Sequence, residues 1–453
     1  MGAAMPELML RPRLRQAARA VARVTSMLSV PDHLPALPEG RVVLFSCYDA
    51  DRGMRDASGR YSQLLEGIRR HVAQVGYVPM NLTHPFSSLR SEEVRDGSIV
   101  INRRALLKRL EAMLRQAFGA SASVRLDLET SLYRRLLQQL RPSLVFSIQP
   151  PLGLCRAARQ LGIVVVEPMH GNNISPQDRI FMHHMGRADD VLPQVLMAFD
   201  DVTQATLRQV CQGRDIAPLR ARHPWIQLCR REAEQRRATE PGPANAVMLS
   251  LQWGYDGERE ALGGIVPNGV LHPAIEQAIA DTAGSRLRWL LRLHPVQVTM
   301  PGYTHHRRHL EQLAARHPHV ELERPTAMPL PLLLDEVSAH LTMSSASTGD
   351  AAEAGVPSLL LCPTLQPGGA NHGMFRELEA QGRATFGHLD ATAIVDWLRS
   401  CPPRTRPPLD AHALAAEHEA DLAFYRQLLD GAIARPAEAP TLWLPHPPAR
   451  GAL

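Results

Sequence analysis

The chain has 453 residues, which is too long for one compact hydrophobic core and favours two domains. Apolar residues make up 45% of it, as in ordinary globular proteins, and the net charge of +5 suits anionic ligands or an anionic membrane surface. Nucleic-acid binding is disfavoured, because no run of Lys and Arg is interleaved with aromatic residues.

The six cysteines are scattered, and no Cys-x-x-Cys pair or other zinc or iron–sulfur spacing occurs. We therefore expect reduced, mostly buried thiols, no bound metal and a cytoplasmic protein. No apolar run reaches the roughly 18 residues that a membrane span needs. The N-terminal arginines are not followed by the apolar core of a signal peptide.

Residues 8–28 form an Arg-rich, Ala-rich helical candidate, and a Pro-rich connector follows, so residues 1–40 are treated as an N-terminal extension. In one interpretation this is a solvated helix that packs one side on the domain. In the other it is a surface helix that contacts anionic lipid, which would hold the protein at the inner face of the membrane.

A βα pattern runs through residues 41–238 and predicts a Rossmann-like, doubly wound first domain. A polar loop with Asp49 and Asp51 follows its first strand. The expected strands are 41–48, 76–80, 143–148, 163–167 and 191–199, and the expected helices are 62–75, 103–117, 128–140, 152–161 and 203–212.

A histidine follows the strand at 163–167, in the sequence Pro168-Met169-His170-Gly171-Asn172-Asn173. A glycine and two asparagines after a buried strand allow a tight turn with positive φ, which presents His170 at the carboxyl edge of the sheet. In one interpretation His170 contacts substrate or acts as an acid or base. In the other it satisfies carbonyl groups of the turn.

The polar segment 236–245 is the best linker, and the βα rhythm restarts after it, so a second Rossmann-like domain is expected at 246–405. A helix at 411–432, within the segment 406–435, is expected to return to the first domain, and the Pro-rich tail 436–453 to be disordered. The strands expected in the second domain are 246–251, 288–293, 320–323, 340–343 and 358–362, and the helices are 272–283, 306–316, 331–336 and 350–354.

Two stretches of the second domain suggest an anion site. Arg292 and His294 end one strand, at the edge where open α/β sheets bind ligands. The hydroxyl-rich turn Ser344–Gly349 follows another strand and precedes a short helix, where backbone N–H groups suit a phosphate. The alternatives are that the Ser/Thr cluster is only a helix N-cap and that His-Pro is only a turn.

Several blocks resemble GT-B glycosyltransferases of bacterial capsule and surface-polysaccharide synthesis. The stretch Glu167–Ile174 is similar to their Glu-Leu-Gln-His-Gly-x-Ile signature, although Pro168-Met169 replaces Leu-Gln. The later blocks, in the same order, are Leu192-Pro193-Gln194 with Phe199, Arg292-Leu293-His294-Pro295, and Ser344 to Pro357. The last two also resemble bacterial sialyltransferases, Kdo transferases and polyol-phosphate transferases of teichoic acid assembly. The resemblance covers roughly residues 140–400.

The resemblance implies an α/β protein of the GT-B type, with two Rossmann-like doubly wound domains facing across a cleft. It implies metal-independent transfer of a sugar from a nucleotide-activated donor to a surface-polysaccharide or glycolipid acceptor, with no cofactor other than the donor substrate. It also implies a donor site in the second domain, with Glu353 on the ribose or sugar. The phosphate-binding residues would be Arg292, His294, Ser344, Ser345, Ser347 and Thr348.

An inverting transferase needs a base from its first domain to take the acceptor proton. The candidates are Asp51, preferred over Asp49 because Gly53 lets the loop bend, and His170. Asp49 and Asn172 are assigned to the acceptor side. Asp51 is alternatively an Asx-turn residue. We expect the linker at 241–245 to act as a hinge that closes the domains over the donor.

Three other functions remain open: a nucleotide-sugar epimerase, a polyol-phosphate transferase that uses a CDP-alcohol, and a non-catalytic nucleotide-binding protein of a polysaccharide assembly complex. A Rossmann dehydrogenase is disfavoured, because no Gly-x-Gly-x-x-Gly follows a strand near the N-terminus. The sequence leaves open the donor, the acceptor, the stereochemical course and the oligomeric state.

Overall fold

The computed structural model describes Thr25, Leu28 and residues 30–48, 54–84, 94–170, 174–237, 245–255, 263–401 and 411–431. Several predicted features lie outside these residues. They are Asp49, Asp51, Asn172, most of the basic segment 8–28, linker residues 238–244 and the tail 436–453.

The first sheet has six strands in the order β4-β1-β5-β6-β7-β8. β1 pairs in parallel with β4 and β5, and β5 pairs in parallel with β6. Every residue of β1 and β5 is buried, because helices cover both faces of such a sheet. The strands are β1 (Val42–Cys47), β4 (Val78–Thr83), β5 (Leu144–Ser147), β6 (Val164–Pro168), β7 (Val195–Ala198) and β8 (Ala217–Arg220).

The predicted helices of this half begin and end within two residues of their predicted limits, except α4, which begins at Val124, four residues before the predicted start at 128. They are α2 (Gln63–Gln74), α3 (Asn102–Ala117), α4 (Val124–Leu140), α5 (Leu152–Gln160), α6 (Arg179–Met185), α7 (Asp201–Cys211) and α8 (Pro224–Arg237). An antiparallel hairpin, β2 (Met54–Asp56) with β3 (Gly59–Tyr61), was not predicted. Its strands have three residues each, too short for a periodicity signal.

The second sheet has six strands in the order β11-β10-β9-β12-β13-β14, and all of its recorded pairs are parallel. Its central strand, β9, lies between the two strands that carry the predicted phosphate motifs. The strands are β9 (Ala246–Ser250), β10 (Arg288–Arg292), β11 (Val320–Glu321), β12 (Ala339–Thr342), β13 (Ser358–Leu360) and β14 (Ala384–Phe386).

The helices of the second half alternate with these strands, apart from the short α10 and α12, which follow strand ends. They are α9 (Pro273–Asp281), α10 (Pro295–Thr299), α11 (Thr304–Arg316), α12 (Glu323–Ala327), α13 (Leu330–Asp335), α14 (Ser347–Glu353), α15 (Arg376–Ala380) and α16 (Ala391–Ser400). The prediction for α14 was wrong at its start, because it begins at Ser347 and not at Asp350. Ser347 and Thr348 therefore belong to the helix, and the turn before it ends at Ala346.

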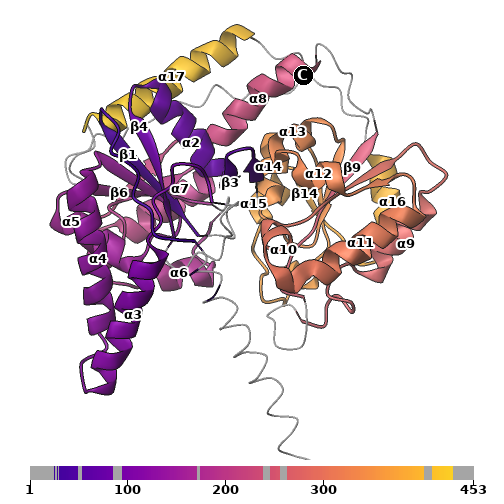
Figure 1. Cartoon of the computed structure of the whole chain (residues 1–453). Coiled ribbons are helices and arrows are strands. Elements are labelled where there is room, and N and C mark those ends of the chain that lie inside the picture. Colours follow the sequence, from indigo (N-terminus) through magenta and orange to yellow (C-terminus); the bar gives the residue numbers. More distant parts are fainter. Residues whose placement is uncertain are drawn as a thin grey trace, which may run out of the picture. The chain divides into compact units, whose positions relative to one another are not determined.

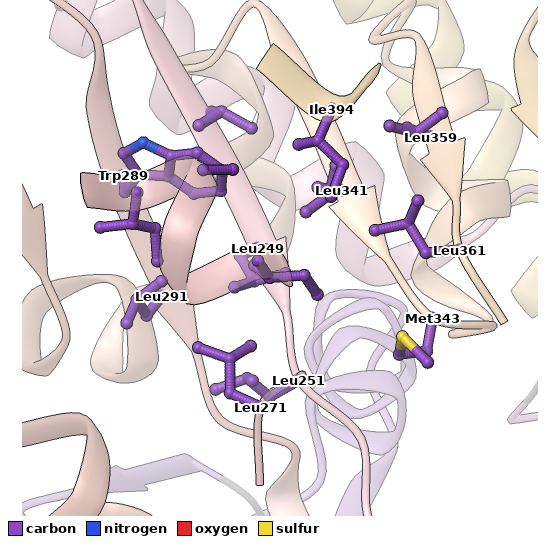
Figure 2. Packing of buried hydrophobic residues seen from close by; sticks show 14 of the residues in the cluster. Leu249, Leu251, Leu271, Trp289, Leu291, Leu341, Met343, Leu359, Leu361 and Ile394 are labelled. Atoms are coloured by element: carbon purple, nitrogen blue, oxygen red, sulfur yellow. The ribbon is translucent and has the colours of Figure 1, made fainter. Parts of the chain in front are cut away.

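Two hydrophobic clusters hold the second sheet between helices. Val247 and Leu249 point into one of them, and Ala246 and Met248 into the other, as the two-residue period of a strand requires. Trp289 is fully buried in the larger cluster, among Leu249, Leu291, Leu341 and Ile394 (Figure 2), and its Nε1–H donates to Thr282 Oγ1 at 2.9 Å.

By residue contacts the chain divides into two compact units. One holds residues 1–62, 72–167 and 188–195, and the other holds 63–71, 168–187 and 196–453. α17 (Ala411–Leu429) lies in the second unit, where Asp421 pairs with Arg222 at 2.9 Å and Glu417 with Arg230 at 3.1 Å. The domain boundaries expected from the sequence stay predictions.

Among the residues that the structure describes, no helix has the length and apolarity to cross a membrane. No group of three or more His, Cys, Asp or Glu side chains in the same residues is placed to hold a metal ion.

Gly153→Ala is expected to lower the free energy of unfolding by about 1–3 kcal/mol, because it overpacks the contact between α5 and α4. An added Cβ would lie 2.7 Å from the backbone nitrogen of Thr130 and 2.6 Å from Cγ of Glu129. Urea denaturation measures the decrease. The control is Gly284→Ala, whose added Cβ would meet no atom within 4 Å. Equal decreases in the two variants would show that close packing is not the cause.

Candidate functional site

Arg292 ends β10 and is held in place by backbone oxygens. Its Nη1 donates to the carbonyl oxygens of Pro325, at 2.6 Å, and Met328, at 2.5 Å. Burial lowers the pKa of Arg292 to about 10, and the Asp350 carboxylate opposes this, so the guanidinium is charged at neutral pH. Within the described part of the chain, Nε and Nη2 have no hydrogen-bond partner. These N–H groups can therefore bind a phosphate, whose oxygens match the planar guanidinium.

His294 is the N-cap of α10, in the arrangement called a capping box. Its Nδ1 accepts a hydrogen bond from the Val296 N–H at 3.1 Å, and its own backbone N–H donates to Gln297 Oε1 at 2.8 Å. Burial, and then the positive charge of Arg292, lower the pKa of His294 to about 4. The ring is neutral at pH 7 with its proton on Nε2, so it offers an N–H donor and no charge.

Gln252, two residues after the end of β9, connects the two predicted motifs. Its carbonyl oxygen accepts from Gln297 Nε2 at 3.0 Å, and its side-chain Oε1 accepts from the Ser344 N–H at 2.6 Å. Gln297 is also the partner of the His294 backbone. The cap at His294 and the turn at Ser344 are thus fixed to one residue at the carboxyl end of the central strand.

The hydroxyl groups of the turn bond mostly to one another and to the backbone. Thr348 Oγ1 donates to the Ser345 carbonyl at 2.7 Å, and Ser347 Oγ donates to Ser345 Oγ at 2.9 Å. Ala346 is the N-cap of α14, and it has no side-chain cap. These side chains therefore hold the turn in shape, and their contact with a phosphate stays a prediction.

A buried histidine, His340, contacts Ser347 of this turn through its side chain. His340 is fully buried in β12, with Ser358 Oγ 2.9 Å from its Nδ1 and Ser250 Oγ 3.0 Å from its Nε2. Ser347 Oγ lies 3.3 Å from the same Nε2. Burial lowers the pKa of His340 to about 3, so the ring is neutral and joins β9, β12 and β13 to the start of α14.

We expect the free energy of unfolding to decrease as the pH falls below about 6.5. Burial is the first cause that lowers the pKa of His71, His223 and His294 to about 4 and that of His340 to about 3. The unfolded chain then binds protons that the folded chain does not, so the stabilisation by these four neutral rings is complete above pH 6.5 and is lost as the pH falls towards 4.

Urea denaturation at about pH 7.5, 6.0 and 5.0 measures this slope. His340→Gln keeps a hydrogen-bonding side chain and removes one of the four titrating groups, so its slope should be shallower than that of the wild type. A stability that does not change over this range would contradict the assignment of neutral buried rings.

Two carboxyl groups lie three residues apart on α14. The Glu353 side chain keeps an exposed surface, but the protein around it excludes part of its water, and this desolvation, followed by the negative charge of Asp350, raises its pKa to about 8. Arg220 and Arg230 of the same unit oppose this rise, and Asp200 adds to it. The raised pKa favours the protonated form of Glu353, which can both donate and accept a hydrogen bond.

The structure brings together five of the residues predicted from the sequence, at the carboxyl edge of the second sheet. They are Arg292, His294, Ser344, Ser345 and Ser347. Thr348 is fully buried, and Glu353 is the last residue of α14, at the end opposite to Ser347. His170 is exposed and follows β6 of the first sheet, and its role stays a prediction.

No protein-family model matches the sequence, and no curated protein matches it. Solved structures do match. A variant of the wall teichoic acid polymerase TagF soaked with CDPG has a TM-score of 0.50 at 12% identity, over 95% of this chain and 99% of that one. The UDP-GlcNAc 2-epimerase of Methanocaldococcus jannaschii has a TM-score of 0.49 at 10% identity, over 85% of this chain and 99% of that one. The UDP-GlcNAc 2-epimerase of Neisseria meningitidis, bound to UDP-GlcNAc, has a TM-score of 0.47 at 12% identity, over 86% and 100%.

At such low identity the likeness establishes the fold alone, and the narrower resemblance to capsule, sialyl- and Kdo-transferases stays a prediction. The two six-stranded α/β sheets and the match over nearly the whole chain together show that this protein has the GT-B fold.

Proposed function

We propose that the chain is a GT-B-type glycosyltransferase that moves a sugar from a nucleotide-activated donor to a surface-polysaccharide or glycolipid acceptor. One observation carries the proposal: the fixed guanidinium of Arg292 and the neutral imidazole of His294 both offer N–H groups at the carboxyl edge of the second sheet. That edge is where open α/β sheets bind ligands.

The chemistry of sugar transfer fits these donors. The bond between the sugar and the phosphate oxygen of the donor breaks, and negative charge develops on the departing phosphate. A charged arginine and an N–H donor that are already in place stabilise this charge without a metal ion. The acceptor hydroxyl bonds to the sugar and gives its proton to a base, for which Asp51, Asp49 and His170 remain the candidates.

Glu353 is proposed to bind a hydroxyl group of the ribose or the sugar in its protonated form. Donor affinity should then decrease as the pH rises through about 8, where Glu353 loses its proton. Glu353→Gln cannot lose a proton, so the affinity of this variant should not change over the same range. Isothermal titration calorimetry at about pH 7 and pH 9 measures both, and an equal dependence in the two proteins would remove Glu353 from the site.

A polyol-phosphate transferase is the second candidate, because the TagF structure that matches 95% of this chain was soaked with CDPG. In that reaction Arg292 and His294 would contact the phosphate group that is transferred, so the same residues serve both. An epimerase is the third, and it differs because it changes the donor without an acceptor.

Thermal-shift measurements with CMP, CDP, UDP, GDP and their sugars test the proposal first. A ligand at 100 times its dissociation constant adds about 2.7 kcal/mol of stability, so the correct nucleotide should raise the melting temperature clearly. The best donor is then incubated alone, and the products are separated. A transferase leaves the sugar of the donor unchanged until an acceptor is added. An epimerised sugar would indicate an epimerase instead, and transfer of a polyol phosphate to an acceptor would indicate a polyol-phosphate transferase.

A further inference from the structure

One helix, α3, exposes a group of large apolar side chains. Eleven large hydrophobic residues are exposed among those that the structure describes, and five of them lie on α3 or directly after it. They are Leu107 (65% exposed), Leu110 (46%), Met113 (59%), Leu114 (62%) and Phe118 (89%). Single exposed apolar residues are ordinary, but a group of this size on one helix marks an interaction surface.

These side chains form one continuous stripe. At about 100° per residue, the five positions fall within an arc of about 140° around the helix. Ala105 and Ala112, which are buried, lie outside this arc and mark the side of α3 that packs on the protein. Figure 1 shows α3 and α4 as neighbouring helices that extend away from the strands of the first sheet.

Basic residues border the stripe. Residues 102–118 contain five basic side chains and one acidic one, Glu111. Glu111 is neutralised within the helix, by Lys108 at 2.7 Å and Arg115 at 2.5 Å. Lys108 and Arg115 flank the stripe on one side and Arg109 on the other, so an apolar strip lies between two positive edges.

We propose that this face of α3 lies on the surface of an anionic lipid bilayer. An amphipathic helix with a bulky apolar face and lysines or arginines at its borders buries that face among the lipid chains and holds the acidic headgroups with its charges. A second copy of the same face is a poorer partner, because it would bring positive edges against positive edges. The surface is distinct from residues 8–28, and it does not depend on which reaction the protein catalyses.

Flotation of the full chain with vesicles tests the proposal. Vesicles of phosphatidylcholine with about 30% phosphatidylglycerol should bind the protein. Vesicles of pure phosphatidylcholine, or the anionic vesicles in about 1 M salt, should bind it more weakly. The binding constant should fall roughly fivefold for each basic side chain that no longer binds an acidic headgroup. The double variant Leu114→Asp, Phe118→Asp should lower the partition coefficient about tenfold or more. The matched control is Ile180→Asp on α6, which changes a side chain that is 81% exposed outside the stripe and should bind as the wild type does.

A second measurement reports the depth of this helix directly. In Phe118→Trp, brominated lipids should quench more fluorescence than they quench in the wild type, whose five tryptophans give the baseline. Wild-type binding by the double variant, or no additional quenching at position 118, would overturn the proposal. A change of oligomeric state in the double variant without a change in lipid binding would also overturn it, in favour of a second copy of the chain.

Discussion

Arg292→Met is expected to lower kcat/KM for the donor by about 10²–10³-fold, the decrease measured when one preorganised donor is removed from a developing negative charge. Methionine fills a similar volume and carries no N–H group. The guanidinium of Arg292 is desolvated by burial, so water does not fully screen its attraction for a phosphate. Removing this charge should therefore have a large effect. Donor binding should weaken as well, because the phosphates are charged before the reaction begins.

The control for this variant is Arg288→Met. Arg288 is at the other end of the same strand and forms an ion pair with Glu321, away from the carboxyl edge. It should change stability slightly and kcat/KM less than about twofold. If both variants lose the same activity, or if neither does, Arg292 does not contact the donor.

His294→Asn is expected to lower kcat/KM by about 10–100-fold while leaving stability nearly unchanged. Asparagine is a good N-cap residue and can accept the Val296 N–H as His294 Nδ1 does, but it has no counterpart of the Nε2–H. His294→Ala removes both functions and should cost about 1 kcal/mol of stability in addition.

Steady-state kinetics and urea denaturation on the pair separate the two roles of His294. Because burial and Arg292 lower the pKa of His294 to about 4, its protonation should not appear in a pH–rate profile between about pH 6 and 8. A fully active His294→Asn would leave His294 only as a cap, and a wild-type profile that rises with deprotonation near pH 6.5 would contradict the neutral ring.

Five strands of each sheet and most helices of this protein could be predicted because their signals are local, whereas the edge strands β8 and β14 were not predicted. The strand at Arg288–Arg292 is apolar and bounded by polar residues, and the alternation of such strands with helices defines the class. The start of α14 could not be predicted, because it depends on hydrogen bonds among Ser345, Ser347 and Thr348 that a propensity scale does not contain.

The candidate site was only partly predictable for a related reason. Arg292 and His294 were found because they lie at the carboxyl end of a strand that the sequence predicts. Gln252 and His340 gain their roles from the strand order β10-β9-β12, which brings together residues 45 and 90 positions apart in the chain. The stripe on α3 was also hidden, since in sequence an apolar helical face predicts burial and only the structure shows that it is exposed.

The most direct test of the account is a crystal structure of the protein with the nucleoside diphosphate that gives the largest thermal shift. We predict that phosphate oxygens lie within hydrogen-bonding distance of Arg292 Nε or Nη2 and of His294 Nε2. A nucleotide that binds elsewhere, with neither side chain touching it, would contradict the assignment of this edge of the second sheet as the donor site.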